Sequence, residues 1–342
     1  MSNKTTSETS LLSYYTFSTS LPNANSDLNV NGTFYIVKSA ESAPSVSENL
    51  PASLTMVVPT GLPKKNKCFV CGCARNVAKY ISAVIRNIRK LETVFDEIYV
   101  IMSYDQSDDN TLEILHSFQK EFEQFHIIIN TLPLSDIRTE RIANARNGIL
   151  KYISILQHSN PVFREYAYFC MIDMDNICAG QMYPEIITPY LSRNDWDALS
   201  FFREEYYDIW ALSIRPFVIS CWHWYNYEIS LSVVKAMKKY ICDKRRDTPT
   251  TELIECESAF CGFGIYRLSK FIDCEYNHYM PFQYISPSML RENERAVSMP
   301  LMPDIEKYCG DCEHRWFHME AIQKHDAKIR ISPLILFGPA PE

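Results

Sequence analysis

The chain contains 342 residues with a net charge of −7 at pH 7, and nearly half of its residues are hydrophobic. This length suits one large domain or two small ones. The negative charge does not favour non-specific nucleic-acid binding, and no basic stripe or nucleic-acid motif is present. The sequence has neither an apolar run long enough to span a bilayer nor a signal-peptide core. We therefore expect a cytoplasmic globular protein without a transmembrane segment or membrane anchor.

The twelve cysteines could indicate a secreted disulfide protein, but several lie inside apolar runs, where buried free thiols are common. Two groups could instead be considered as zinc ligands: Cys68, Cys71 and Cys73, and Cys309 with Cys312. Side chains alternate along a strand, so the first group cannot converge on one ion. We therefore expect reduced cysteines and regard zinc as the weaker interpretation.

Residues 1–66 differ from the rest of the chain in composition. They are rich in Ser, Thr, Asn and Pro and show little periodicity, which predicts a largely disordered tail. The remaining residues, 67–342, are expected to form one domain.

Apolar runs alternate with amphipathic stretches in the first half of this domain. Strands are expected at 68–73, 97–102, 126–129 and 168–173, with helices at about 75–91, 112–122 and 136–156. A polar turn at 103–111 carries helix-capping residues before the second helix. This alternation predicts an α/β fold with a mostly parallel central sheet flanked by helices.

The second half of the domain is less regular. A strand is expected at 198–202, a charged surface stretch at 238–247, and strands at 329–331 and 334–336 that would close the sheet. Neither glycine-rich phosphate-binding pattern, GxGxxG or GxxxxGK[ST], is present.

Two carboxylates follow the apolar run at 168–172. Because side chains alternate along a strand, Asp173 and Asp175 should point the same way from its end. Paired oxygen ligands at the carboxyl end of a buried strand suit a Mg²⁺ or Mn²⁺ ion that also holds substrate phosphates. The alternative is a strand-end turn whose carboxylates are solvated or cap the backbone.

Basic and polar residues near the other strand ends are candidates for binding the phosphates and other polar parts of such a substrate. Arg138 and Arg141 are neighbours on one helix face, and the arginine fork matches phosphate oxygens; Arg146, further along, is a weaker candidate. The candidates that follow the first and second strands are Arg75, Tyr104 and Asp105.

A second polar cluster lies near the C-terminus. His314 and His318 share a helix face, and His314 could complete the coordination of the ion held by the aspartates. Asp311 or Glu313 could act as general base toward a substrate hydroxyl. A capped helix start with a core histidine is the alternative, and His318 suits that structural role best.

Aromatic clusters in the second half could stack on a sugar, although most aromatic residues in any domain belong to its core. Within the segment 206–210, Asp208 and Trp210 are candidates for contact with a sugar.

Together these motifs resemble the GT-A fold of nucleotide-sugar-dependent glycosyltransferases over about residues 67–337. The residues that carry the resemblance are the Asp173-Met174-Asp175 (DxD) triplet and the segments 107–111, 138–147 and 258–266. Residues 312–318 read C-E-H-R-W-F-H, similar to a C-E-H-x-x-F-H signature of a protist and giant-virus subset of these enzymes. The Glu-Asp pair common in processive members is absent.

The resemblance implies transfer of a sugar from a nucleotide-diphosphate donor to a glycan, lipid or protein hydroxyl, assisted by Mn²⁺ or Mg²⁺. It also implies that Asp175 binds the ion most directly and that Asp173 contacts the ribose or the ion. The ion would neutralise the diphosphate as it leaves.

Three other functions compete with this one. A haloacid-dehalogenase-type phosphatase would use Asp173 as nucleophile, but Ile177 stands where that motif has Thr or Val. A nucleotidyltransferase would need the missing glycine-rich loop. A non-catalytic interaction or zinc-bearing module on a transferase scaffold is the third alternative.

Overall fold

The structure is a computed structural model that describes residues 66–131, 133, 135–224, 227–299 and 310–339. All but the last residue of the predicted N-terminal tail lies outside this range. The strands are β1 (Lys67–Ala74), β2 (Glu97–Tyr104), β3 (Phe125–Ile129), β4 (Tyr166–Asp173), β5 (Ala198–Phe202), β6 (Ile254–Cys256), β7 (Phe263–Arg267) and β8 (Ile329–Ile335). The helices are α1 (Ala78–Lys90), α2 (Thr111–Glu121), α3 (Arg138–Ser159), α4 (Thr188–Leu191), α5 (Tyr227–Asp247), α6 (Pro287–Val297) and α7 (Glu313–His325).

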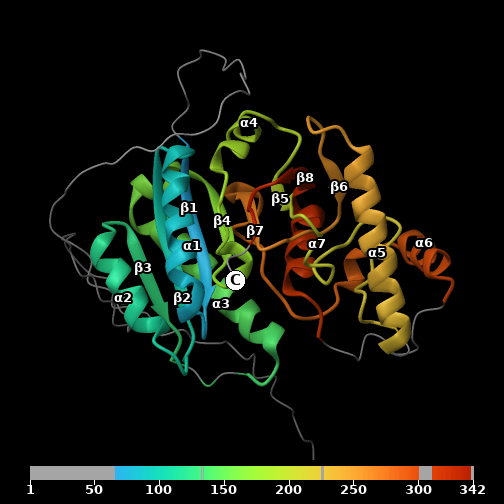
Figure 1. Cartoon of the computed structure of the whole chain (residues 1–342), viewed down its shortest axis with the longest axis horizontal. Helices are drawn as coiled ribbons and strands as arrows, with labels where there is room; N and C mark the ends of the chain where they lie inside the picture. The colour runs from blue at the N-terminus through green and yellow to red at the C-terminus, as the bar shows by residue number, and fades with distance from the viewer. Residues whose placement is uncertain (1–65, 132, 134, 225–226, 300–309, 340–342) are drawn as a thin grey trace, which may run out of the picture.

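The strands form one eight-stranded sheet in the order β3-β2-β1-β4-β7-β5-β8-β6. Strands β1 to β4 pair in parallel, as do β5 and β8, whereas β7 and β6 run antiparallel to their neighbours. Figure 1 shows α2 and β3 at one side of the molecule and α5 and α6 at the opposite side. The predicted α/β class, with a mostly parallel sheet flanked by helices, is confirmed.

The far edge of the sheet differs from the prediction. Residues 329–335 form the single strand β8, which lies one strand inside the edge, and the three-residue strand β6 closes the sheet. The charged stretch at 238–247 is the second half of α5. Sequence pattern missed β6 because three residues are too few to show a period.

Alternating side chains place the central strands between two apolar layers. In β1, Phe69 and Cys71 pack on the layer that contains α3, whereas Cys68 and Val70 pack on the layer that contains α1. The continuous apolar runs are thus explained by burial on both faces. The same alternation directs Cys68 and Cys71 to opposite faces of the sheet, so these two cannot bind one zinc ion.

The polar turn at 107–111 serves the expected helix, since Asp109 Oδ1 accepts from Thr111 N at the start of α2 at 3.1 Å, and it also caps a second helix. Thr111 Oγ1 accepts from the backbone N–H of Val77 at 3.0 Å, and Asp109 Oδ2 accepts from that of Ala78 at 3.0 Å. These are donors at the start of α1, which begins three residues later than predicted, after Asn76 with φ 54°. The turn therefore joins the carboxyl end of β2 to the start of α1.

The loop after β4 is held by α1. The buried side-chain amide of Asn87 donates to the carbonyls of Cys178 and Gly180, at 2.9 and 2.6 Å, and its oxygen accepts from Met182 N. This fixes the backbone that follows Asp175. Among the described residues, no helix is both long enough and apolar enough to cross a membrane.

Candidate active site

A pocket of about 350 Å³ opens at the carboxyl ends of β1, β2 and β4, beside the first half of α3. Its volume falls in the range of about 300–1,000 Å³ typical of small-molecule sites. Seven predicted residues line it: Arg75, Asp105, Arg138, Arg141, Arg146, Asp173 and Asp175. Topology brings them together, because parallel strands end at the same edge of the sheet.

The β2 side of the pocket carries Asp105 and Ser103. Asp105 is 8% exposed and accepts from Asn130 Nδ2 at 2.9 Å. Burial raises its pKa, while the charges of Arg75 and Arg141 act in the opposite direction. Ser103 Oγ is buried and has no hydrogen-bond partner among the described residues. This side therefore offers a carboxylate acceptor and a hydroxyl to a ligand.

Tyr104 was predicted on the same side, but it does not line the pocket. Its side chain is 8% exposed, and its hydroxyl accepts from Ser107 N at 3.1 Å. Tyr104 therefore supports the loop that caps α1. Ser103, its neighbour, was missed, because a serine at a strand end has no distinctive pattern.

Arginines form a second wall. Arg138 and Arg141 belong to the first turn of α3, as their spacing predicted, and Arg141 Nη1 donates to Ser135 O. Arg75 Nε donates to Gln106 O at 3.2 Å. A helix N-terminus and three guanidinium groups make this wall favourable for an anion.

Acidic side chains form a third part of the lining, which we call the acidic wall. Asp173 ends β4 with its side chain 25% exposed, and Asp175 follows as the cap of a 3-10 turn, its Oδ1 accepting from Ile177 N at 3.0 Å. Burial raises the pKa of Asp173 to about 7; Arg146 opposes this shift, and the charges of Asp175 and Asp208 add to it. The capping alternative is thus correct for one oxygen of Asp175, yet both aspartates line the pocket.

Asp208 lies close enough to act on Asp173, although it does not line the pocket. Its Oδ1 accepts from Ala211 N at 3.1 Å, and burial raises its pKa to about 6. Three carboxylates therefore accumulate negative charge in a partly buried place. Their hard oxygen atoms, and the raised pKa values of Asp173 and Asp208, fit a Mg²⁺ or Mn²⁺ ion, which would relieve that charge.

Arg146 connects this wall to the C-terminal cluster. Its Nη2 lies 3.4 Å from Asp173 Oδ1, while its Nη1 contacts Glu313 Oε1 and lies 2.6 Å from His314 Nε2. The guanidinium group is buried and also lies over the ring of Phe260. Sequence reasoning ranked Arg146 as a weak phosphate contact, whereas the structure makes it the centre of a buried ionic network.

His314 lies behind this arginine. It is 1% exposed, its ring stacks on Phe260 with centroids 3.9 Å apart, and burial lowers its pKa well below the usual range. Within the described residues, neither Asp173, Asp175 and His314 nor the three aspartates 173, 175 and 208 form a group of ligand atoms that all lie within 4.8 Å of one another. The neutral imidazole contacts Arg146, an arrangement that favours a supporting role over metal binding.

The two predicted bases are enclosed. Asp311 is fully buried and pairs with Arg315 Nε at 2.6 Å, and Glu313 is 4% exposed and pairs with Arg146. A general base must reach the proton it removes. This geometry favours structural ion pairs for both carboxylates. His318, predicted to be structural, bonds Ser258 Oγ and Tyr266 OH inside the core.

No protein-family model matches the chain, and no curated protein matches its sequence. Solved structures with a similar fold include S. aureus TarS in complex with UDP-GlcNAc, at 14% identity and TM-score 0.40, covering 81% of this chain and 59% of that one. Mannosyltransferase PcManGT from Pyrobaculum calidifontis, in complex with GDP-Man and Mn²⁺, covers 76% and 65% at 12% identity and TM-score 0.37. Glucosyl-3-phosphoglycerate synthase from Mycobacterium tuberculosis, in complex with UDP, covers 60% and 58% at 13% identity and TM-score 0.33.

The chain spans 55% and 59% of the first two TarS chains that it matches. Likenesses at these TM-scores carry no argument about the reaction. The chemistry of the pocket must therefore support any assignment of function.

Proposed function

We propose that this chain is a metal-dependent glycosyltransferase, which moves a sugar from a nucleotide-diphosphate donor to a hydroxyl of a glycan, lipid or protein. One observation carries the proposal. A single pocket at the carboxyl ends of β1, β2 and β4 joins a buried carboxylate, an arginine wall and an acidic wall. These suit the nucleoside, the diphosphate and a divalent ion of such a donor.

The nucleoside is assigned to the β2 side. Asp105 would accept a hydrogen bond from a ribose hydroxyl or a base N–H, and Ser103 Oγ would supply a second polar contact. The neighbouring arginines oppose the pKa rise caused by burial and so favour the ionised form of Asp105.

The diphosphate is assigned to the space between the arginines and the aspartates. Arg138 and Arg141 would bind its oxygens, with Arg75 at the entrance. Asp175 and Asp173 would hold the Mg²⁺ or Mn²⁺ ion, and a bound ion supplies electrostatic neutralisation of the leaving diphosphate. Arg146 would keep the Asp173 carboxylate in place.

The acceptor hydroxyl needs a group that removes its proton. Asp311 and Glu313, the bases expected from sequence, are enclosed by Arg315 and Arg146. Asp208 is half-buried, and its pKa of about 6 lies closer to pH 7 than that of an ordinary carboxylate. A pKa near the working pH suits a group that accepts a proton. We therefore assign contact with the reacting sugar or its acceptor to Asp208.

A thermal-shift screen tests the proposal. Nucleotide diphosphates and nucleotide sugars are added with and without Mn²⁺ or Mg²⁺ to wild type, Asp175→Asn and Asp247→Asn. Asparagine retains an oxygen that can accept from Ile177 N, so the first variant should fold. The second changes an exposed aspartate at the end of α5 and serves as the matched control.

Ligand at about 100 times its Kd stabilises a protein by about 2.7 kcal/mol, or roughly 5–10 °C for a domain of this size. We expect such a metal-dependent shift with one nucleotide, lost in Asp175→Asn and kept in Asp247→Asn. No shift with any nucleotide would contradict the proposal. Metal-dependent hydrolysis of a generic phosphomonoester would then favour the phosphatase, with Asp173 as nucleophile.

A further inference from the structure

We propose that Asp273, Cys274 and His325 form a zinc site at the end of α7 away from the donor pocket. Glu313, which contacts the pocket network, begins this helix, and His325 ends it. At 1.5 Å per residue, the two ends lie about 18 Å apart along the axis. The site is therefore separate from the acidic wall and independent of the proposed function.

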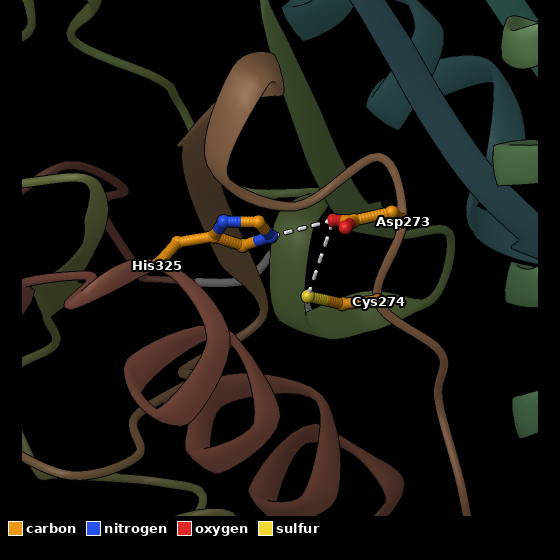
Figure 2. Close-up of side chains that lie close together, drawn as sticks. All are labelled: Asp273, Cys274 and His325. Atoms are coloured by element: carbon orange, nitrogen blue, oxygen red, sulfur yellow. Dashed lines mark hydrogen bonds and ion pairs between the residues drawn. The ribbon is translucent and has the colours of Figure 1, made fainter.

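The three side chains converge from two segments. Asp273 and Cys274 lie in the turn after β7, and His325 is the last residue of α7. The nitrogen, oxygen and sulfur ligand atoms all lie within 4.8 Å of one another, with His325 Nε2 at 2.7 Å and Cys274 Sγ at 3.9 Å from Asp273 Oδ1. Figure 2 shows the imidazole and the thiol both directed toward the Asp273 carboxylate.

Two lysine side chains bind the backbone that carries these three ligands. Lys324 Nζ donates to Asp273 O at 2.8 Å, and Lys270 Nζ donates to His325 O at 2.7 Å. Ligands on a fixed backbone lose less conformational freedom when an ion binds. This cross-bracing gives the site a pre-formed geometry that a chance surface contact lacks.

The chemical types of the three ligands indicate which metal ion this site would prefer. One thiolate, one imidazole and one carboxylate are typical zinc ligands, and three protein ligands leave a fourth tetrahedral position for water. Asp273 is exposed, so that position can face solvent, while Cys274 is buried. The hard Mg²⁺ or Mn²⁺ ion assigned to the donor pocket would not prefer sulfur.

The charges around the site balance. Zinc replaces the thiol proton of Cys274, which passes to solvent, so two anionic ligands then neutralise the divalent ion. The charges of Glu320 and Lys324 act on Cys274, and Lys270 Nζ lies at His325 O. The ammonium of Lys324 is itself paired with Glu320 Oε1 at 2.9 Å, which reduces its repulsion of a cation. The bound ion would tie α7 to the turn after β7.

Zinc binding to chelator-treated full-length protein tests the inference. Titration calorimetry gives the affinity and stoichiometry for wild type, Cys274→Ser, His325→Gln and the control Cys242→Ser, an exposed cysteine of α5. Co²⁺ is a second probe, because thiolate coordination adds a charge-transfer absorption band. We expect one strong site, weakened by more than about 100-fold in both ligand variants, since outer-shell changes alone cost about 10–100-fold.

We also expect the thiolate band of Co²⁺ to disappear in Cys274→Ser and to persist in Cys242→Ser. His325→Gln changes a half-buried side chain, so it tests the site even if the buried Cys274 variant fails to fold. Wild type that binds no zinc, or tight zinc retained in His325→Gln, would overturn the inference. The nucleotide screen does not depend on either result.

Discussion

Arg146 offers the most direct test of how the candidate site is built. The variant Arg146→Met keeps much of the buried stem but removes the guanidinium group that contacts Glu313, His314 and Asp173. Arg146 and Glu313 are each about 5% exposed. The Glu313 carboxylate that remains in the variant therefore cannot be solvated without opening the core.

The expected loss of folding free energy in Arg146→Met follows from that burial. Removing one partner of a buried ion pair typically costs about 3–5 kcal/mol. For a domain of this size, each kcal/mol lowers Tm by about 2–4 °C, so we expect a loss of roughly 10 °C. An exposed pair gives the contrast: Arg89 lies 3.2 Å from Glu121 with both side chains about half exposed, so Arg89→Met should cost less than about 1 kcal/mol.

Urea denaturation at pH 7, with chelator present, measures the change in unfolding free energy. The double variant Arg146→Met with Glu313→Gln should be about 1–3 kcal/mol more stable than the sum of the single effects predicts. The reasoning is refuted if Arg146→Met costs less than 1 kcal/mol, or if the two substitutions prove additive within about 0.5 kcal/mol.

Further predictions concern stability around the sheet. Burial raises the pKa of Glu257 to about 7, so the stability present below about pH 4.5 is lost as pH rises through 7. Glu257→Gln should therefore stabilise the protein by up to about 3 kcal/mol at pH 8 and leave it unchanged at pH 4, as denaturation at both pH values would measure; equal effects would contradict this. Asn87→Leu removes three hydrogen bonds to residues 178–182 and should cost about 2–4 kcal/mol in urea, whereas a cost below 1 kcal/mol would exclude Asn87 as the anchor of that loop. Gly72→Ala places a Cβ about 2.7 Å from Met174 Sδ and should lower stability by about 1–3 kcal/mol, and an unchanged Tm would show that Met174 moves freely.

The local sequence pattern was sufficient to predict the central strands and the helices next to them. The apolar runs of β1, β2 and β4 are long enough to show burial on both faces, and amphipathic stripes marked α1 and α2. Because parallel strands end at one edge, the pattern also indicated that Asp105, Asp173 and the α3 arginines would meet. These features depend on residues close together in the chain, so propensity and periodicity report them.

Tertiary structure alone decided which distant groups the polar and charged side chains contact. Asp109 and Thr111 suit a helix cap, but pattern cannot say that they cap α1, more than thirty residues earlier in the chain. Arg146 contacts Glu313, which lies 167 residues later in the chain, and also His314. These contacts show that Arg146 belongs to a buried ionic network, which the sequence pattern did not reveal. The energy of a charge depends on its desolvation and its neighbours, and both are set by how distant segments pack.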